Sequence, residues 1–199
     1  MATKERQIFI TELVGKALNE DAKSVSFDWL VNKHHQPHFQ SSYNIICDIY
    51  SSMGGMNPDK RITKLSPDAY FAGEYNFLFE FDELQHFTTA RLNTFAYYPK
   101  GLKLNYSIED WVWFCNLYSH KADRYRYKKT CADFDFEGGR TCGRAYFDCF
   151  RDLLPQYQGI NPTLRIAEFE VADITSINTA SIDKIKRLLD SKLKYFYKR

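Results

Sequence analysis

The chain has 199 residues, of which 44% are hydrophobic and 17% aromatic. This length and composition favour one packed domain over a disordered segment. No run of about 18 apolar residues occurs, and the first residues lack the apolar stretch of a signal peptide, so we expect neither a membrane span nor a secretion signal. The five cysteines, an odd number without CxxC spacing, suit reduced thiols and a cytoplasmic location.

The net charge is only +2, but it is unevenly distributed. Residues 68–83 contain five acids and no lysine or arginine. Residues 121–130 contain five basic groups and one acid, and residues 181–199 contain seven basic groups and two acids. An acidic centre with basic flanks is typical of an enzyme that holds a metal ion and a surrounding polyanion.

The first part of the chain predicts two helices and a loop. Apolar stripes predict helices over residues 4–20 and 41–53, the second ending at Gly54-Gly55. Three of the five histidines lie between them, at His34, His35 and His38. Pro37 disfavours a helix there, so we expect a loop near a DNA surface or in solvent rather than a zinc site.

A strand with acids on one side only follows at residues 76–83. Period-two alternation places three phenylalanines on one face and Glu80 and Asp82 on the other. If residues 68–71 and 77–82 form a hairpin centred on Glu74, Asp68 falls opposite Glu80. Carboxylates that converge in this way repel one another unless a cation binds between them, and Mg²⁺ is the expected cation.

The remaining chain predicts five further elements. Residues 88–98 form a helix or helical turn, and Ser107 is the N-cap of the next helix. A glycine loop then leads into a helix within residues 137–155. The last two elements are a strand over residues 163–171 and a basic amphipathic helix over about 181–197.

Two segments between residues 121 and 144 could contact nucleic acid, and the charges of the last helix form either a solvated face, the favoured interpretation, or a further nucleic-acid site. The alternating run Arg124-Tyr125-Arg126-Tyr127-Lys128 suits phosphate contacts with base stacking, but equally an exposed strand whose tyrosines pack inward. Arg140 and Arg144 lie at the start of the helix after the glycine loop, where a helix amino terminus favours an anion. An ordinary loop and helix start is the alternative for that segment.

The run Pro67-Asp68, an eleven-residue gap, and Glu80-Phe81-Asp82 resembles the metal-binding signature of the PD-(D/E)XK nuclease superfamily. The continuation through Gln85-His86, with Arg91 shortly after, is most similar to its very-short-patch-repair endonuclease branch. The resemblance covers roughly residues 66–99. Asp82 stands where the superfamily has a lysine, and Glu83 stands where the branch has a glycine. The resemblance therefore specifies neither the group that activates water nor the shape of the turn.

This resemblance implies an α/β domain with a restriction-endonuclease-like core, a small mixed β-sheet flanked by helices. It implies a DNA endonuclease dependent on Mg²⁺, with Mn²⁺ as a substitute, acting on double-stranded DNA in restriction, phage defence or repair. Asp68, Glu80 and Asp82 would hold the metal, Gln85 would position a water or a phosphate oxygen, and His86 would transfer a proton. Arg91 would contact the phosphate or pair with one of the acids. The expected DNA contacts are Arg91, Lys121, Arg124, Arg126, Lys128, Lys129, Arg140 and Arg144.

Other functions remain open on sequence alone. The same fold could serve as a catalytically inactive nucleic-acid-binding or assembly module. The acids could also be the solvated face of a half-buried strand, with the basic patches merely on the surface. A homodimer or a larger defence complex is a further expectation, since double-strand cutters often pair.

Overall fold

The computed structural model describes residues 3–33, 40–57 and 61–194. The histidine cluster at His34, His35 and His38 and the residues after 194 lie outside this part of the chain. Within the described ranges, no helix combines the length and the apolar character needed to cross a membrane.

A small mixed sheet forms the centre of the molecule. Its strands are β1 (Ala69–Phe71), β2 (Phe77–Asp82) and β3 (Asn161–Ala167), in the spatial order β1-β2-β3. β1 pairs with β2 antiparallel, and β2 pairs with β3 parallel. The expected mixed α/β architecture is therefore confirmed at this level.

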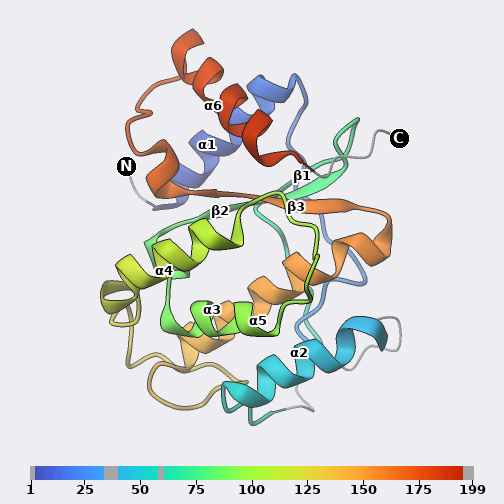
Figure 1. The fold of residues 1–199 in the computed structure, drawn as a ribbon, viewed down its shortest axis with the longest axis vertical. Helices are drawn as coiled ribbons and strands as arrows, with labels where there is room; N and C mark the ends of the chain where they lie inside the picture. Colours follow the sequence, from blue (N-terminus) through green and yellow to red (C-terminus); the bar gives the residue numbers. More distant parts are fainter. Residues whose placement is uncertain (1–2, 34–39, 58–60, 195–199) are drawn as a thin grey trace.

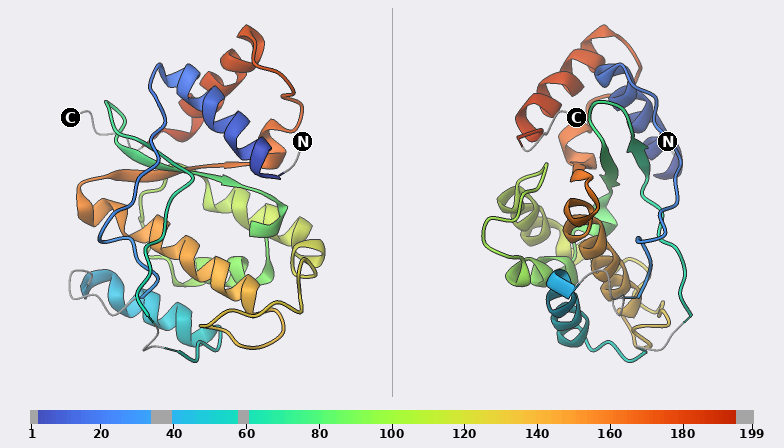
Figure 2. Two further views of the ribbon diagram at one scale, coloured as in Figure 1. Left: turned by 180° about the vertical axis from the view of Figure 1, so that it is seen from behind. Right: turned by 90° about the vertical axis from the view of Figure 1, so that its right-hand side faces the viewer.

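Helices cover both faces of the sheet (Figures 1 and 2). α1 (Thr3–Leu18) and α6 (Thr179–Lys192) pack together on one face. The other face carries α2 (Gln40–Ser52), α3 (Thr89–Thr94), α4 (Ile108–Ala122) and α5 (Gly139–Leu153). Short 3₁₀ turns are η2 (Leu84–His86), η3 (Phe95–Tyr97), η4 (Pro155–Gln158) and η5 (Glu168–Val171).

The alternation of β2 is confirmed, but both of its faces are buried. Phe77, Phe79 and Phe81 join the core beneath α1 and α6, whereas Leu78 belongs to the core on the other face. All six residues of β2 are buried, as expected for a central strand with helices on both sides. Its acids therefore face protein rather than solvent, which excludes the solvated-face alternative for this strand.

The predicted hairpin register is confirmed. Ala69 pairs with Phe79 and Phe71 with Phe77, so the turn is centred on residue 74. Continued by one residue, this register places Asp68 opposite Glu80. The period-two pattern assigned the faces of β2, and the turn centred on residue 74 set the register.

Two later predictions and one alternative interpretation need correction. The strand predicted over residues 163–171 ends at Ala167, and η5 begins at the next residue. The Glu170 side chain accepts a hydrogen bond from the Ala167 amide at 2.7 Å and so caps η5. The last helix ends at Lys192, because the backbone of Leu193 is no longer helical. The basic-aromatic run after α4 forms turns rather than a strand. Ser107 caps α4 as predicted, accepting a hydrogen bond from the Asp110 amide.

Truncating the central core should test this packing. We expect Phe79→Ala to lower the free energy of unfolding by about 3–5 kcal/mol, because the ring is fully buried and a cavity replaces it. Its edge contacts Phe71, with the ring centroids 6.2 Å apart. Chemical denaturation followed by circular dichroism measures the loss.

The matched control is Trp113→Ala, which removes another aromatic ring from a side chain that is 58% exposed. It should change the free energy of unfolding by less than about 0.5 kcal/mol. Equal effects for the two variants would contradict the core assigned to β2.

Candidate functional site

The hairpin brings two carboxylates together at the start of β1. The Asp68 amide donates a hydrogen bond to Glu80 Oε1 at 3.3 Å, and the Phe81 amide donates one to Asp68 Oδ2 at 2.8 Å. These bonds hold the two carboxylates side by side across the strand pair. The convergence predicted from the hairpin register is therefore present.

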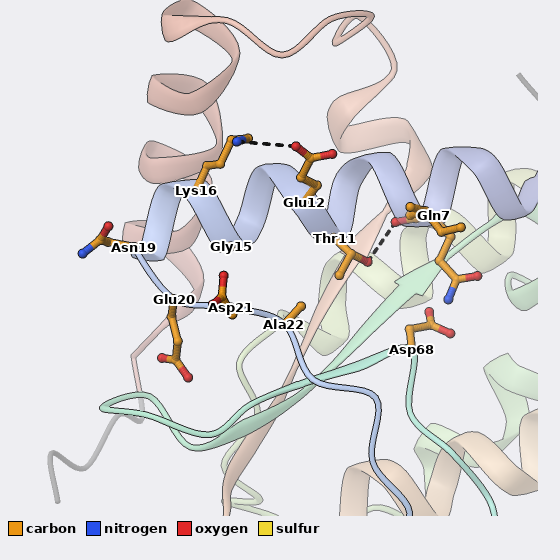
Figure 3. A pocket seen from close by; sticks show the side chains of 11 residues that line it. Gln7, Thr11, Glu12, Gly15, Lys16, Asn19, Glu20, Asp21, Ala22 and Asp68 are labelled. Carbon is orange, nitrogen blue, oxygen red and sulfur yellow. Dashed lines mark hydrogen bonds and ion pairs between the residues drawn. The ribbon is translucent and has the colours of Figure 1, made fainter.

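Both carboxylates line a cavity of about 280 Å³ between the hairpin and α5. Asp68 also borders a larger hollow of about 860 Å³ beneath α1, where Glu12 pairs with Lys16 at 3.4 Å (Figure 3). Asp68 is thus accessible from two sides. The smaller cavity is lined by Asp68, Glu80, His86, Cys131, Arg140, Gly143, Arg144, Phe147, Asp148 and Arg151.

The charged forms of both acids are disfavoured. Burial raises the pKa of Asp68 and, more strongly, that of Glu80, whose side chain is almost wholly buried. Within the described residues, no arginine, lysine or histidine lies within ion-pair distance of Asp68; the cation nearest to Glu80 is Arg151, with its Nε 3.0 Å from Glu80 Oε1. A cation bound in the cavity would stabilise the charged forms of both carboxylates.

Asp82 has a different environment from the one predicted. Its Oδ1 accepts a hydrogen bond from Arg165 Nη1 at 2.7 Å, and its Oδ2 accepts one from Trp111 Nε1 at 2.8 Å. Both oxygens are therefore occupied by protein donors, and Asp82 does not line the cavity. The structure gives this residue a supporting position behind Glu80 and His86.

A buried ion network lies behind the cavity wall. Arg165, fully buried on β3, also donates to Asp152 Oδ1 at 2.8 Å and to Asp148 Oδ1 at 3.3 Å, both on α5. Burial alone raises the pKa of each aspartate, but attraction to Arg165, and to His86 in the case of Asp148, lowers it below its usual value. These two acids are therefore charged and paired, in contrast to Asp68.

Arg91 belongs to this network and not to a DNA surface. Its guanidinium, which is 1% exposed, donates to Asp152 at 2.6 Å and to the hydroxyls of Tyr98 and Tyr106 at 2.9 and 3.2 Å. Buried charges are retained where they are paired in this way. The expectation that Arg91 contacts DNA is therefore wrong.

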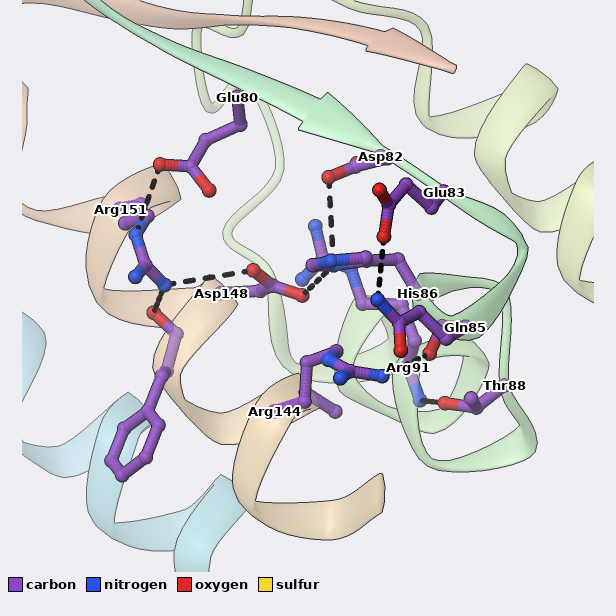
Figure 4. Close-up of polar contacts among 12 residues, drawn as sticks. Glu80, Asp82, Glu83, Gln85, His86, Thr88, Arg91, Arg144, Asp148 and Arg151 are labelled. Atoms are coloured by element: carbon purple, nitrogen blue, oxygen red, sulfur yellow. Dashed lines mark hydrogen bonds and ion pairs between the residues drawn. The ribbon is translucent and has the colours of Figure 1, made fainter. Parts of the chain in front are cut away.

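His86 is positioned by acids from two elements. Its Nδ1 lies 3.0 Å from Asp148 Oδ2 and 3.5 Å from Asp82 Oδ1 (Figure 4). Because a carboxylate only accepts hydrogen bonds, Nδ1 carries the proton, and Nε2 is the nitrogen left for a ligand. Gln85 does not share the cavity: its side chain donates to Glu83 at 2.5 Å and lines a neighbouring pocket.

The predicted basic residues gather near one edge of the cavity. Lys121, Arg124, Arg126, Lys128 and Lys129 are all exposed. Backbone hydrogen bonds tie their loop to the start of α5, from Gly138 to Tyr127 at 2.7 Å and from Arg140 to Lys129 at 3.1 Å. Tyr125 and Tyr127 are 45% and 50% exposed, which excludes the alternative in which these rings pack inward.

Arg140 and Arg144 form the basic wall of the cavity, one helical turn apart on α5. Arg144 donates to the Gln85 carbonyl at 2.9 Å. Its pKa is lowered, first by burial and then by the neighbouring charge of Arg140, although Asp148 opposes this. An anion in the cavity would relieve that repulsion.

Sequence reasoning missed Asp148, Arg151, Asp152 and Arg165. A signal existed on α5, where Asp148 and Asp152 interrupt an apolar helix face at i, i+4 spacing. Arg165 likewise interrupts a buried strand. Neither signal reveals the partner, because Arg165 pairs with acids 13 to 83 residues away that lie on other elements.

Comparison of the chain with protein-family models, with curated proteins and with solved structures gave no match. Among the described residues, no three histidine, cysteine, aspartate or glutamate side chains are arranged to hold a metal ion. Asp68 and Glu80 alone form the converging pair, which matches the one or two protein carboxylates that Mg²⁺ commonly uses.

The raised pKa of Glu80 predicts how stability depends on pH. The charged form costs stability above the folded-state pKa, and protonation removes this cost as the pH falls toward the ordinary value of 4.5. We therefore expect Glu80→Gln to raise the free energy of unfolding at pH 7, with a gain that shrinks toward pH 4.5. Urea denaturation at several pH values measures it.

Asp152→Asn provides the opposite case. The lowered pKa of Asp152 means that its stabilisation is complete above the ordinary value of 3.8 and is lost as the pH falls through the folded-state pKa. This variant should be destabilised by about 3–5 kcal/mol at pH 7. If the free energy of unfolding falls at pH 7 in both variants, Glu80, like Asp152, belongs to a stabilising ion pair.

Proposed function

We propose that this protein is a metal-dependent endonuclease of double-stranded DNA with a restriction-endonuclease-like core. The observation that carries the proposal is the hairpin register, which holds Asp68 beside Glu80 at a cavity whose other wall is basic. Acids opposite arginines suit a cation and a phosphate in one place. The setting that we propose is restriction, phage defence or repair in the cytoplasm, as a homodimer or within a larger complex.

The chemistry of the donor set fits Mg²⁺ or Mn²⁺. Asp68 and Glu80 offer oxygen ligands, and burial raises the pKa of both, so a divalent cation would stabilise their charged forms. When bound, such a cation neutralises charge on the phosphate and makes water more acidic. Asp82 is left out of this ligand set, because Arg165 and Trp111 occupy its oxygens.

Two residues of the cavity wall would handle the proton. His86 is held through Nδ1 by Asp148, which leaves Nε2 to take a proton from water or to give one to the leaving oxygen. Asp82 and Arg165 act as positioning residues, because they fix the end of β2 against α5. In this arrangement Gln85 contributes its carbonyl to Arg144 rather than its side chain to a phosphate.

The exposed basic loop between α4 and α5 would guide the duplex to the cavity. Its side chains are free to contact the phosphate backbone, and Tyr125 and Tyr127 offer exposed rings. Arg140 and Arg144 continue this surface into the cavity. Specificity for a DNA sequence would require base contacts in addition.

A specific observation favours a second candidate, an inactive binding or assembly module of the same fold. Glu80 and Asp82 each lie against an arginine, at 3.0 and 2.7 Å. Two arginines thus already compensate two of the three predicted metal ligands. Such a protein would bind duplex DNA without cleaving it.

Cleavage of supercoiled plasmid distinguishes the two candidates. We expect nicking or cutting with Mg²⁺ or Mn²⁺, none with EDTA, and a loss of at least about a hundredfold in Asp68→Ala and Glu80→Ala, which remove the proposed ligands. Glu12→Ala is the matched control, since Glu12 pairs with Lys16 on α1.

Both substitutions must leave duplex binding in EDTA intact, which separates lost chemistry from lost folding. Metal-dependent cleavage that survives in both variants would place the active site elsewhere. Duplex binding without any cleavage in the wild type would favour the inactive module.

The basic loop makes a separate prediction. Replacing Arg126 and Lys128 with alanine should weaken duplex binding and reduce the slope of log K against log salt by about two. The matched control replaces Lys186 and Arg187 on α6, which are exposed but lie on the opposite face of the sheet. An equal effect of both double variants would indicate nonspecific attraction to total charge.

A further inference from the structure

Arg151 lies where a cation would be expected to bind. This residue of α5 lines the cavity, with its Nε 3.0 Å from Glu80 Oε1 and its Nη1 3.7 Å from Asp148 Oδ1 (Figure 4). Its charge also acts on Asp68 and opposes the rise in pKa that burial causes there. The charge of this one guanidinium thus acts on three carboxylates: it contacts Glu80 and Asp148 and acts on Asp68 from a longer distance.

The contact between Arg151 and Glu80 is close but poorly directed. Arg151 Nε is buried and makes no hydrogen bond, so the 3.0 Å approach to Glu80 is an ionic contact without alignment. The terminal nitrogens donate instead to the carbonyls of Ser66 and Phe147, at 3.0 and 3.2 Å. Arg165 differs, because its Nε and Nη1 donate aligned hydrogen bonds to Asp152 and Asp82.

The two arginines also differ in exposure. The Arg165 side chain is fully buried, whereas 14% of the Arg151 side chain is exposed, on the wall of a cavity. A guanidinium with an open side and an unaligned contact can leave its carboxylate at a smaller cost than one enclosed by three acids. Arg151 is therefore the exchangeable cation of the cluster.

We propose that Arg151 is the resident counter-ion of the metal site and that a divalent cation displaces it from Glu80. This inference rests on the proposed function. The displaced guanidinium then joins Arg140 and Arg144, which lie eleven and seven residues earlier along α5 and line the same cavity. Metal binding would in this way complete the phosphate-binding wall.

The charges of the wall explain why the exchange is useful. With Arg151 on Glu80, one positive charge partly offsets the charge of the two cavity acids while no metal is bound. Once a divalent cation takes over Glu80, three arginines face the cavity and require an anion, which the phosphate of a nucleic-acid strand supplies. Binding of metal and phosphate would therefore be mutually favourable.

Direct titration with Mn²⁺, followed by electron paramagnetic resonance, tests the exchange without relying on activity. We expect Arg151→Gln to bind Mn²⁺ about tenfold or more tightly than the wild type, because no guanidinium competes for Glu80. Arg144→Gln is the matched control: it removes the same charge from the same cavity, but Arg144 donates to a carbonyl rather than to an acid. Its affinity should rise by less than about threefold.

Two further variants keep the test sharp. Glu80→Ala combined with Arg151→Gln should lose the gain, since the contested ligand is gone. Arg151→Lys retains a charge with different geometry, so its gain in Mn²⁺ affinity should be intermediate. If thermal melting shows that Arg151→Gln folds poorly, Arg151→Lys supplies the test in its place. With saturating Mn²⁺, Arg151→Gln should bind duplex DNA more weakly than the wild type.

The outcomes separate this inference from the proposed function. Equal Mn²⁺ affinity in the wild type, Arg151→Gln and Arg151→Lys, together with metal-dependent cleavage, would overturn the exchange and leave the nuclease. Equal gains in Arg151→Gln and Arg144→Gln would reduce the effect to net charge and also overturn it. Absence of Mn²⁺ binding and of cleavage in all variants would overturn both proposals.

Discussion

The position of the candidate site depends on one buried guanidinium. Arg165 extends from β3 and joins Asp82 of β2 to Asp148 and Asp152 of α5. A buried charge left unpaired costs several kcal/mol, so these groups have little freedom to separate. Because Asp148 also holds His86, the same interaction fixes the histidine at the cavity.

This constraint divides the acids into two groups. The pKa of Asp148 is lowered first by His86 and then by Arg165, and that of Asp152 is lowered by Arg165 and Arg91, whereas burial raises the pKa values of Asp68 and Glu80. A protein keeps unfavourable charges where function needs them. The contrast supports the cavity, rather than the network behind it, as the place where a ligand binds.

Arg151 connects the two groups. It lies against Glu80 on the cavity side and near Asp148 on the network side, and its contacts are less well directed than those of Arg165. If the cavity is the proposed metal site, partial compensation of its acids by Arg151 would stabilise the site before a metal binds. Residues 68–83 contain five acids and no lysine or arginine. In the folded protein, arginines from distant parts of the chain pair with two of these acids, Glu80 and Asp82.

The sequence by itself determined the local features: the alternation of β2, the Asp68–Glu80 register and the Ser107 cap follow from period-two patterning and from bonds between near neighbours. It also indicated the mixed α/β class. Only the tertiary structure decided what the charges do. Arg165 is 83 residues from Asp82, and Arg91 is 61 residues from Asp152. Ion pairing at such separations depends on how helices and strands pack, and no local pattern encodes it.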